Sequence, residues 1–117
     1  MLGLPSTVRI FLCRTPADLR YSFDGLMGLA QNIFEQDPLS GHLFLFINRR
    51  RDRIKILFWD RDGFCIWYKR LEVGRFQLPR ATSDEQGVEL DYWQLAMLLG
   101  GIDFTSARRR QRYHRAG

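Results

Sequence analysis

The sequence has no hydrophobic run long enough to cross a membrane, since no apolar segment approaches the roughly 20 residues that a bilayer span requires. Its opening stretch, MLGLPSTVRIFLC, contains neither the charged region nor the small-residue cleavage site of a signal peptide. Internal repeats are also absent. We therefore expect a cytoplasmic protein without a membrane partner.

Cysteine is scarce, and its two occurrences, Cys13 and Cys65, lack the CxxC spacing that is typical of metal and redox sites. Both lie in apolar stretches, where a free cysteine behaves as a small buried hydrophobic residue in a reducing compartment. The sequence therefore predicts no metal site and no cofactor, and it shows no sign of a small-molecule substrate.

Charges of opposite sign occupy different parts of the chain, which has a net charge of +5. Residues 49–80 contain ten basic residues and four acidic ones, whereas residues 81–107 contain five acidic residues and no lysine or arginine. Residues 108–117 contain five arginines and no acid. This segregation favours binding of a polyanion or of an acidic partner on one side of the protein.

Three short apolar runs in the middle of the chain predict a β-sheet, because they are rich in β-branched and aromatic residues. The runs span residues 42–48, 54–59 and 64–70, and charged turns separate them. Asp62-Gly63 supplies the positive φ that a tight hairpin needs. We expect an antiparallel meander. Its first strand is apolar on both faces and should therefore lie inside the sheet, covered on both sides.

The segments before and after this meander predict one helix each. Residues 7–13 alternate and indicate a further strand, a candidate partner for the meander. Thr15 and Pro16 have the character of a helix cap and a first helical residue, and an apolar stripe continues to Ile33. Gly25 and Gly28 in this stripe suggest a close approach of the helix to the sheet.

Downstream, residues 75–79 are a candidate last strand, and residues 88–90 form at most a short one. Asp91 and Gln94 have the spacing of a capping box before a second apolar stripe that ends at Ile102. At 45% hydrophobic residues the chain can bury one core. The predicted architecture is α+β: an antiparallel β-sheet meander packed against an N-terminal and a C-terminal helix, in a single domain of residues 1–104. Residues 105–117 are expected to be a disordered basic tail.

Several of these segments together resemble a known protein family. The matching segments are Pro16 to Leu26, Asp37 to Phe44, Arg53 with Lys55, Trp59 to Phe64, Tyr68 to Phe76 and Gln94 to Asp103. The chain resembles the TnpB-type accessory protein of the insertion-sequence-66 group, the product of the second open reading frame of these bacterial transposable elements. The resemblance covers residues 8 to 104, with departures at Tyr21, Ser22 and Gly100. It implies a role in transposition beside a separate, larger transposase that performs strand transfer.

Basic residues around the meander are the first candidates for a binding site, because guanidinium groups bind phosphates in pairs of hydrogen bonds. The candidates for nucleic-acid contact are Arg49, Arg50, Arg51, Arg53, Lys55, Arg61, Lys69, Arg70 and Arg75. We expect Arg61 to lie about 20 Å from Arg49–Arg51, at the other end of the middle strand, which gives two basic edges. Lys69, Arg70 and Arg75 are expected towards the first of these edges and should extend it. The alternative is a charged hairpin that only keeps the protein soluble.

The basic tail is the second candidate, because a flexible arginine arm adds salt-sensitive affinity for nucleic acid. Its arginines are Arg108, Arg109, Arg110, Arg112 and Arg115. The alternative is a solvated terminus. A third hypothesis is a base-stacking platform made of Trp59, Trp67, Tyr68 and Phe76, although aromatic residues in a meander are more often core.

Catalysis is the least favoured interpretation. Paired carboxylates among Asp18, Asp24, Asp60 and Asp62 would suit Mg²⁺ and phosphoryl chemistry, yet Asp18 fits a helix cap and the last two fit a turn. His42 at a strand start is interpreted as a structural residue. The sequence thus predicts a non-catalytic accessory factor for transposition that binds element DNA through a basic β-hairpin. The alternative is a protein-interaction module that docks on the transposase, through its acidic region (84–103) or the basic hairpin, without contacting DNA.

Overall fold

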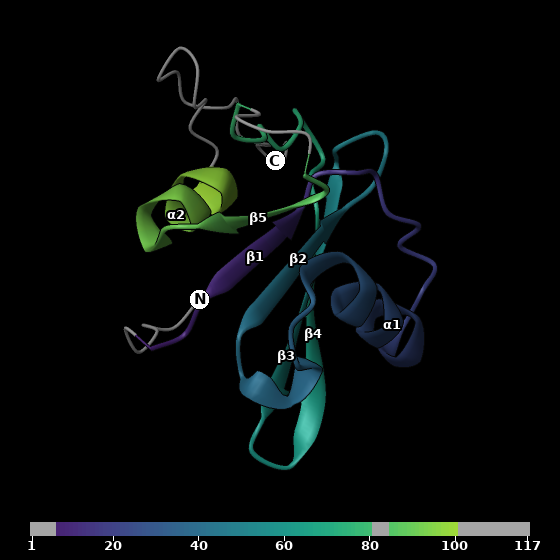
Figure 1. Cartoon of the computed structure of the whole chain (residues 1–117). Helices are drawn as coiled ribbons and strands as arrows, with labels where there is room; N and C mark the ends of the chain where they lie inside the picture. The colour runs from purple at the N-terminus through teal and green to yellow at the C-terminus, as the bar shows by residue number, and fades with distance from the viewer. Residues whose placement is uncertain (1–6, 81–84, 101–117) are drawn as a thin grey trace.

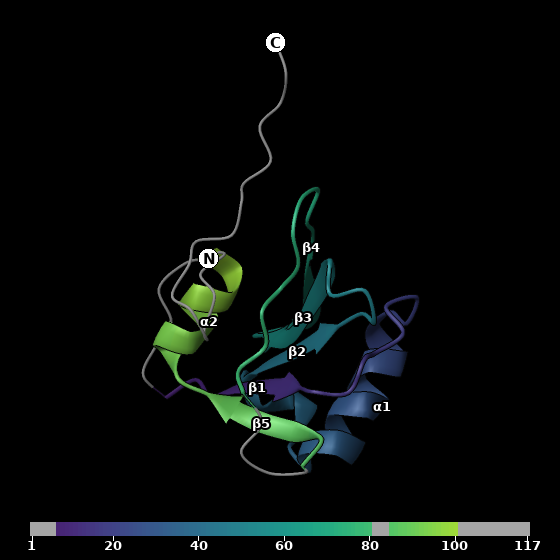
Figure 2. The ribbon, with the colours of Figure 1, turned by 90° about the horizontal axis from the view of Figure 1, so that it is seen from above.

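A five-stranded sheet with a helix on each face forms the part of the chain that the computed structural model describes, residues 7–80 and 85–100 (Figures 1 and 2). The strands are β1 (Ile10–Cys13), β2 (Leu43–Ile47), β3 (Arg53–Asp60), β4 (Gly63–Arg70) and β5 (Gly87–Leu90). The helices are α1 (Phe23–Phe34) and α2 (Tyr92–Gly100), and a short 3₁₀ helix, η1 (Pro38–Ser40), precedes β2. Within the described ranges, no helix is long and apolar enough to span a membrane.

The sheet has the strand order β4-β3-β2-β1-β5, which places β2 in its centre. Strands β2, β3 and β4 form the expected antiparallel meander. All five residues of β2 are buried, and the prediction that this strand is covered on both faces is therefore confirmed. The β-strand expected near residues 88–90 is present as β5 and pairs antiparallel with β1.

The pairing of β1 with β2 is parallel, so the sheet is mixed, and the purely antiparallel meander holds only for β2, β3 and β4. Parallel neighbours need a long crossover connection, and α1 supplies it between these two strands. The alternation of β1 predicted a strand but contained no information about the direction of its partner.

The side chains of alternate residues in the central strand are buried in two separate hydrophobic cores, one on each face of the sheet. Phe44 and Phe46 point to the face that α1 covers, where they pack with Leu26. Leu43, Leu45 and Ile47 point to the other face, where they pack with Leu95 and Leu98 of α2. The period of two residues in a strand explains why a run without polar residues lies between two helices.

The predicted start of the first helix is wrong, because α1 begins at Phe23 rather than near Pro16. The N–H of Ala17 donates to the Ile47 carbonyl at 2.9 Å, which ties this segment to the end of β2. Asp18 accepts hydrogen bonds from the backbone and guanidinium of Arg20 and so closes a local turn. These contacts hold the backbone away from helical geometry despite good capping residues.

Two further expectations need correction. Residues 75–79 form no strand, because Phe76 instead turns into the core on the α2 face. A Cβ on Gly25 would meet the Tyr21 side chain at 2.9 Å, and one on Gly28 would meet nothing within 4 Å, so neither glycine marks contact with the sheet.

The start of α2 shows half of the predicted capping box. The Oε1 of Gln94 accepts a hydrogen bond from the Asp91 N–H at 2.8 Å. The Asp91 carboxylate accepts from the Trp93 Nε1–H at 3.2 Å instead of from the helix backbone. Ile102 and the predicted tail, residues 105–117, lie outside the described residues.

Candidate nucleic-acid interface

The turn that joins β2 to β3 is built around the side chain of Asn48. Its Oδ1 accepts hydrogen bonds from the N–H groups of Asp52 (3.1 Å) and Arg53 (3.0 Å), and its Nδ2 donates to the Asp52 carboxylate (2.7 Å). Arg51 adopts the left-handed conformation, with φ of 61°. The hydrogen bond from Asn48 lowers the pKa of Asp52, and the charges of Arg50 and Arg53 contribute less.

The segment that follows β4 holds the same turn from a second side. The N–H of Leu71 donates to the Asp52 carbonyl at 2.7 Å, and the N–H of Phe76 donates to the Arg51 carbonyl at 2.6 Å. Phe76 is 0% exposed and anchors this segment in the core. The turn therefore has a defined backbone, and Arg75 lies beside it.

Six arginines gather at this end of the sheet, and we call this group the arginine end. It consists of Arg49, Arg50, Arg51, Arg53, Arg70 and Arg75, and all six are exposed. Arg70 forms an ion pair with Glu72 at 2.9 Å, and no carboxylate of the described residues forms an ion pair with the other five. Arg53 and Arg70 lie directly opposite each other on β3 and β4, an arrangement that destabilises a sheet. Fold stability alone therefore does not account for the arginine end.

Two of the other predicted cations lie elsewhere. Arg61 occupies the turn between β3 and β4, at the other end of an eight-residue strand and thus roughly 25 Å from the arginine end at about 3.3 Å per residue. Lys69 faces the α2 side of the sheet, opposite to Arg70, and lines a hollow with Trp67 and Tyr92. The nine candidate residues therefore do not share one face, and the five tail arginines lie outside the described residues.

Lys55 continues the positive charge of the arginine end along the α1 face of β3. Its Nζ lies 5.0 Å from the centroid of the Tyr68 ring and donates a hydrogen bond to the Tyr21 carbonyl at 3.0 Å. Arg53 donates to the Tyr68 hydroxyl at 3.3 Å. Tyr68 is 48% exposed and Tyr21 is 46% exposed. One further cation, Lys55, and two exposed tyrosines thus lie next to the arginine end.

The proposed stacking platform is not assembled. Phe76 belongs to the core, and Trp67 packs partly against it on the α2 face. Trp59 makes an edge-to-face contact with Phe64, with ring centroids 5.1 Å apart. Of the four candidates only Tyr68 is an exposed ring. Lys55 links it to the backbone of Tyr21, whose exposure was not predicted because residue 21 was expected inside a helix.

The carboxylates considered for catalysis do not come together in one site. The Asp18 carboxylate lies 2.7 Å from the Arg20 guanidinium, whose hydrogen bonds lower the pKa of Asp18 to about 2. Asp60 and Asp62 flank the Arg61 turn. The described residues contain no group of three side chains that could hold a metal ion.

His42 accepts a hydrogen bond through Nδ1 from the Arg9 N–H at 2.9 Å, and burial lowers its pKa. Both cysteines are free, and Cys13 is buried, which raises the pKa of its thiol. Cys13 belongs to the core on the α1 face, as expected for a small buried hydrophobic residue, whereas Cys65 is only half-buried.

A sequence model of the family described as IS66 Orf2 like protein matches residues 8–109 of this chain. The chain belongs to this family. The match includes every described strand and helix, together with the arginine end. It associates the protein with the transposition of insertion sequences as an accessory component and agrees with the resemblance carried by the central segments.

Two relatives from Sinorhizobium fredii are similar over nearly the whole chain. The uncharacterized protein y4jC is 29% identical over 110 residues, which cover 94% of this chain and 92% of the relative. The uncharacterized protein y4hO is 34% identical over 104 residues, which cover 89% of each. No solved structure matches this chain.

Proposed function

We propose that this protein is a non-catalytic accessory factor of transposition that binds the DNA of its insertion sequence through the arginine end. The observation that supports this most is a turn held from two sides that presents arginines without ion-pair partners among the described residues. Guanidinium groups make paired hydrogen bonds to phosphate oxygens. A defined backbone lowers the entropy lost when these side chains engage a duplex.

Lys55 and Tyr68 extend the proposed interface along the α1 face. An exposed ring flanked by cations fits a phosphate backbone and an adjacent base at the same time. The arginine end supplies the electrostatic part of the affinity, which does not depend on sequence, and Tyr68 supplies a contact to an unpaired base.

The test is DNA affinity measured by fluorescence anisotropy over a series of salt concentrations. We expect measurable binding of duplex DNA whose affinity falls steeply with salt. The quadruple substitution of Arg49, Arg50, Arg51 and Arg53 by alanine should abolish most of it. The slope of log affinity against log salt should become shallower by roughly 0.9 for each phosphate that the variant no longer neutralises.

A matched control removes the same charge from the tail, by substituting Arg108, Arg109, Arg110 and Arg112 with alanine. Circular dichroism of both variants confirms folding. If the tail variant loses DNA affinity and the arginine-end variant keeps it, the assignment of the interface to the β2–β3 turn is wrong. An assay for Mg²⁺-dependent cleavage or joining, with Asp60→Asn and Asp62→Asn as variants, tests the non-catalytic part of the proposal.

The second candidate function is docking on the transposase without DNA contact, and the segregation of charge along the chain favours it equally. The same experiments separate the two. Absence of DNA affinity at low salt, together with co-purification of the transposase of the element, would support docking in place of DNA binding.

A further inference from the structure

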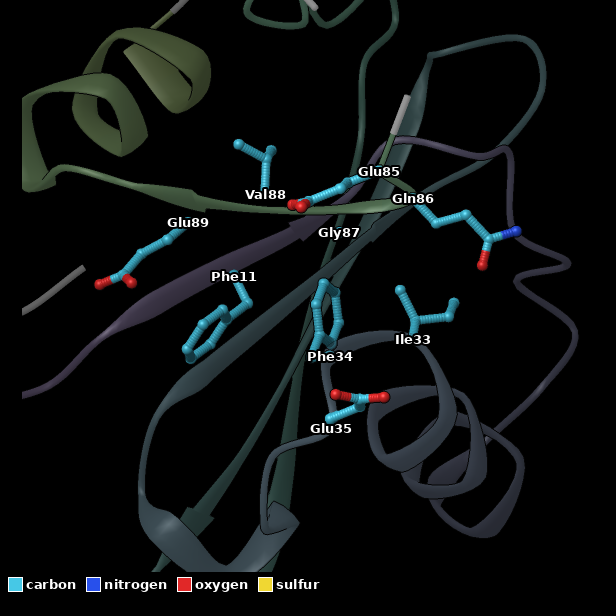
Figure 3. Close-up of a pocket in the computed structure, with 9 residues that line it drawn as sticks. All are labelled: Phe11, Ile33, Phe34, Glu35, Glu85, Gln86, Gly87, Val88 and Glu89. Carbon is cyan, nitrogen blue, oxygen red and sulfur yellow. The ribbon is translucent and has the colours of Figure 1, made fainter. Parts of the chain in front are cut away.

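A groove of about 420 Å³ lies between the C-terminal end of α1 and β5, on the face of the sheet away from α2 (Figure 3). Its floor is apolar and consists of Phe11, Ile33 and Phe34, with the rings of Phe11 and Phe34 5.6 Å apart. Carboxylates border it: Glu35 at the end of α1, Glu85 before β5 and Glu89 within β5. The groove therefore combines apolar surface with carboxylates, although Glu89 is ion-paired with Arg9 and the Arg14 guanidinium donates a hydrogen bond to the Glu85 carbonyl at 3.2 Å.

One end of this region already holds a guanidinium group, that of Arg9. Its Cζ lies 4.9 Å from the centroid of the Phe11 ring, and it donates hydrogen bonds to both carboxylate oxygens of Glu89, at 2.6 and 3.1 Å. A ring below and a carboxylate beside the guanidinium are the two contacts that favour arginine over lysine. The structure thus shows which side chain this surface accommodates.

A second ring and a second carboxylate, those of Phe34 and Glu35, also line the groove, and no cation of the described residues forms an ion pair with Glu35. Glu35 caps α1 in the left-handed conformation, with φ of 52°. That conformation is unfavourable for a residue with a side chain, and a carboxylate at a helix C-terminus is repelled by the helix dipole. A cation placed here would offset both the charge of Glu35 and that of the helix end.

The backbone beside the groove is open for pairing. Strand β5 is the edge of the sheet, and among the described residues no strand lies on its outer side. The N–H of Arg14 donates to the Gln86 carbonyl, and antiparallel ladders alternate between hydrogen-bonded and non-bonded pairs. Gly87 and Glu89 therefore direct their N–H and C=O groups away from β1, toward the open edge. An added strand would place every second side chain over the groove.

We propose that this groove is a docking site for an extended, arginine-bearing segment of a partner protein, which pairs with the edge of β5 and inserts an arginine between Phe34 and Glu35. The charge of Glu35, the contacts of Arg9 and the open edge each favour such a segment. The interaction is independent of DNA binding by the arginine end, and it provides a place where a protein partner in transposition attaches.

The test uses the full chain and a fluorescent nine-residue peptide of alternating arginine and threonine, followed by anisotropy. We expect binding in the micromolar range, at least fivefold weaker for Glu35→Gln and weaker for the corresponding lysine peptide. The matched control is Asp24→Asn, which removes the same charge from the exposed first turn of α1 and should leave the affinity within twofold. Glu35→Gly removes the carboxylate and relieves the left-handed strain, so it should raise the melting temperature while weakening peptide binding.

Three results would overturn the proposal. Absence of binding at millimolar peptide would exclude the site, and equal weakening by Glu35→Gln and Asp24→Asn would reduce the interaction to general charge. If binding appears only after the five tail arginines (Arg108, Arg109, Arg110, Arg112 and Arg115) are replaced by glutamine, the tail of this chain is the occupant instead. The Glu35 variants should retain DNA affinity and the arginine-end variant should retain peptide affinity, so failure of one proposal is distinguishable from failure of the other.

Discussion

The side chains of Asn48 and Asp52 are hydrogen-bonded across the turn between β2 and β3, with the amide Nδ2 2.7 Å from the carboxylate Oδ1. The same amide accepts two backbone N–H groups through its oxygen. Asn48→Ala removes all three hydrogen bonds, and each is worth about 0.5–1.5 kcal/mol. We expect a loss of about 2 kcal/mol in the free energy of unfolding, measured in urea. The control is Asn32→Ala on the exposed side of α1, which should stay within about 0.5 kcal/mol of the wild type. Equal effects of the two substitutions would contradict this role of Asn48.

The burial of Phe76 should contribute much of the free energy that holds the segment following β4 against the rest of the protein. It is 0% exposed, so Phe76→Ala leaves a cavity on the α2 face and should lower the free energy of unfolding by about 3–5 kcal/mol. Phe23, which is 43% exposed at the start of α1, is the matched control, and its substitution by alanine should cost far less. Urea unfolding of both variants measures the difference, and a small effect at Phe76 would show that the segment is held by its backbone alone.

Two glycines should respond to alanine in opposite directions. A Cβ on Gly87 would lie 2.5 Å from a ring carbon of Phe34, whose ring is stacked on Phe44 with centroids 5.6 Å apart. We expect Gly87→Ala to destabilise the protein by about 1–3 kcal/mol through overpacking. A Cβ on Gly28 would meet nothing, so Gly28→Ala should stabilise α1 by about 1 kcal/mol. Thermal unfolding of the two variants gives the sign of each effect, and a stabilising Gly87→Ala would show that Phe34 moves freely.

Stability should depend on pH through His42. Burial and the nearby charge of Arg9 lower its pKa, while the charge of Glu89 opposes this. The folded state therefore binds the proton less tightly than the unfolded chain, so the contribution is present above the unfolded pKa of about 6.5 and is lost as pH falls through and below it. We expect the free energy of unfolding to fall between about pH 7.5 and about pH 5.5. His42→Gln should flatten this dependence, whereas His114→Gln should not. An unchanged profile in His42→Gln would assign the pH dependence to other groups.

Tyr68 should matter for single-stranded DNA if the proposed interface is correct. Stacking of a base on an aromatic ring contributes about 1–3 kcal/mol, so Tyr68→Leu should weaken binding of single strands about fivefold or more. Tyr68→Phe retains the ring, loses the hydrogen bond from Arg53, and should bind almost normally. Tyr92→Leu is the control for exposure alone, since Tyr92 is 56% exposed on α2. The measurement is anisotropy with labelled oligonucleotides, and equal losses for Tyr68→Leu and Tyr92→Leu would argue against a stacking contact.

The sequence predicted the structure correctly where the residues of a segment favour one conformation. The fully apolar β2, the antiparallel hairpin of β3 and β4, and the Gln94 contact at the start of α2 were all predicted and are present. The prediction failed where a segment is compatible with two conformations and a contact with a distant segment selects between them. Thr15 and Pro16 would cap a helix in isolation, but the hydrogen bond from Ala17 to Ile47 keeps this stretch at the end of the sheet.

For the candidate site, too, some features could be predicted from the sequence and others could not. The chemistry of the arginines, and the separation of Arg61 from the others by the length of a strand, follow from composition and from the rise per residue. Arg75 was expected towards the turn and lies there, but it is held there by the buried Phe76 and not by the strand that the sequence suggested for residues 75–79. Tyr21 was missed for a related reason, since its exposure results from the late start of α1.

The sequence by itself determined the strands of the meander, the apolar faces of its central strand, the blocks of charge and the family, because periodicity and motif spacing are local properties of the chain. Only the tertiary structure decided that β1 runs parallel to β2, that Lys69 shares a face of the sheet with α2, and that Glu35 and Glu89 border one groove. The physical reason is that these relationships depend on contacts between segments far apart in the chain. The packing of both faces of the sheet selects such contacts together, and no single segment encodes them.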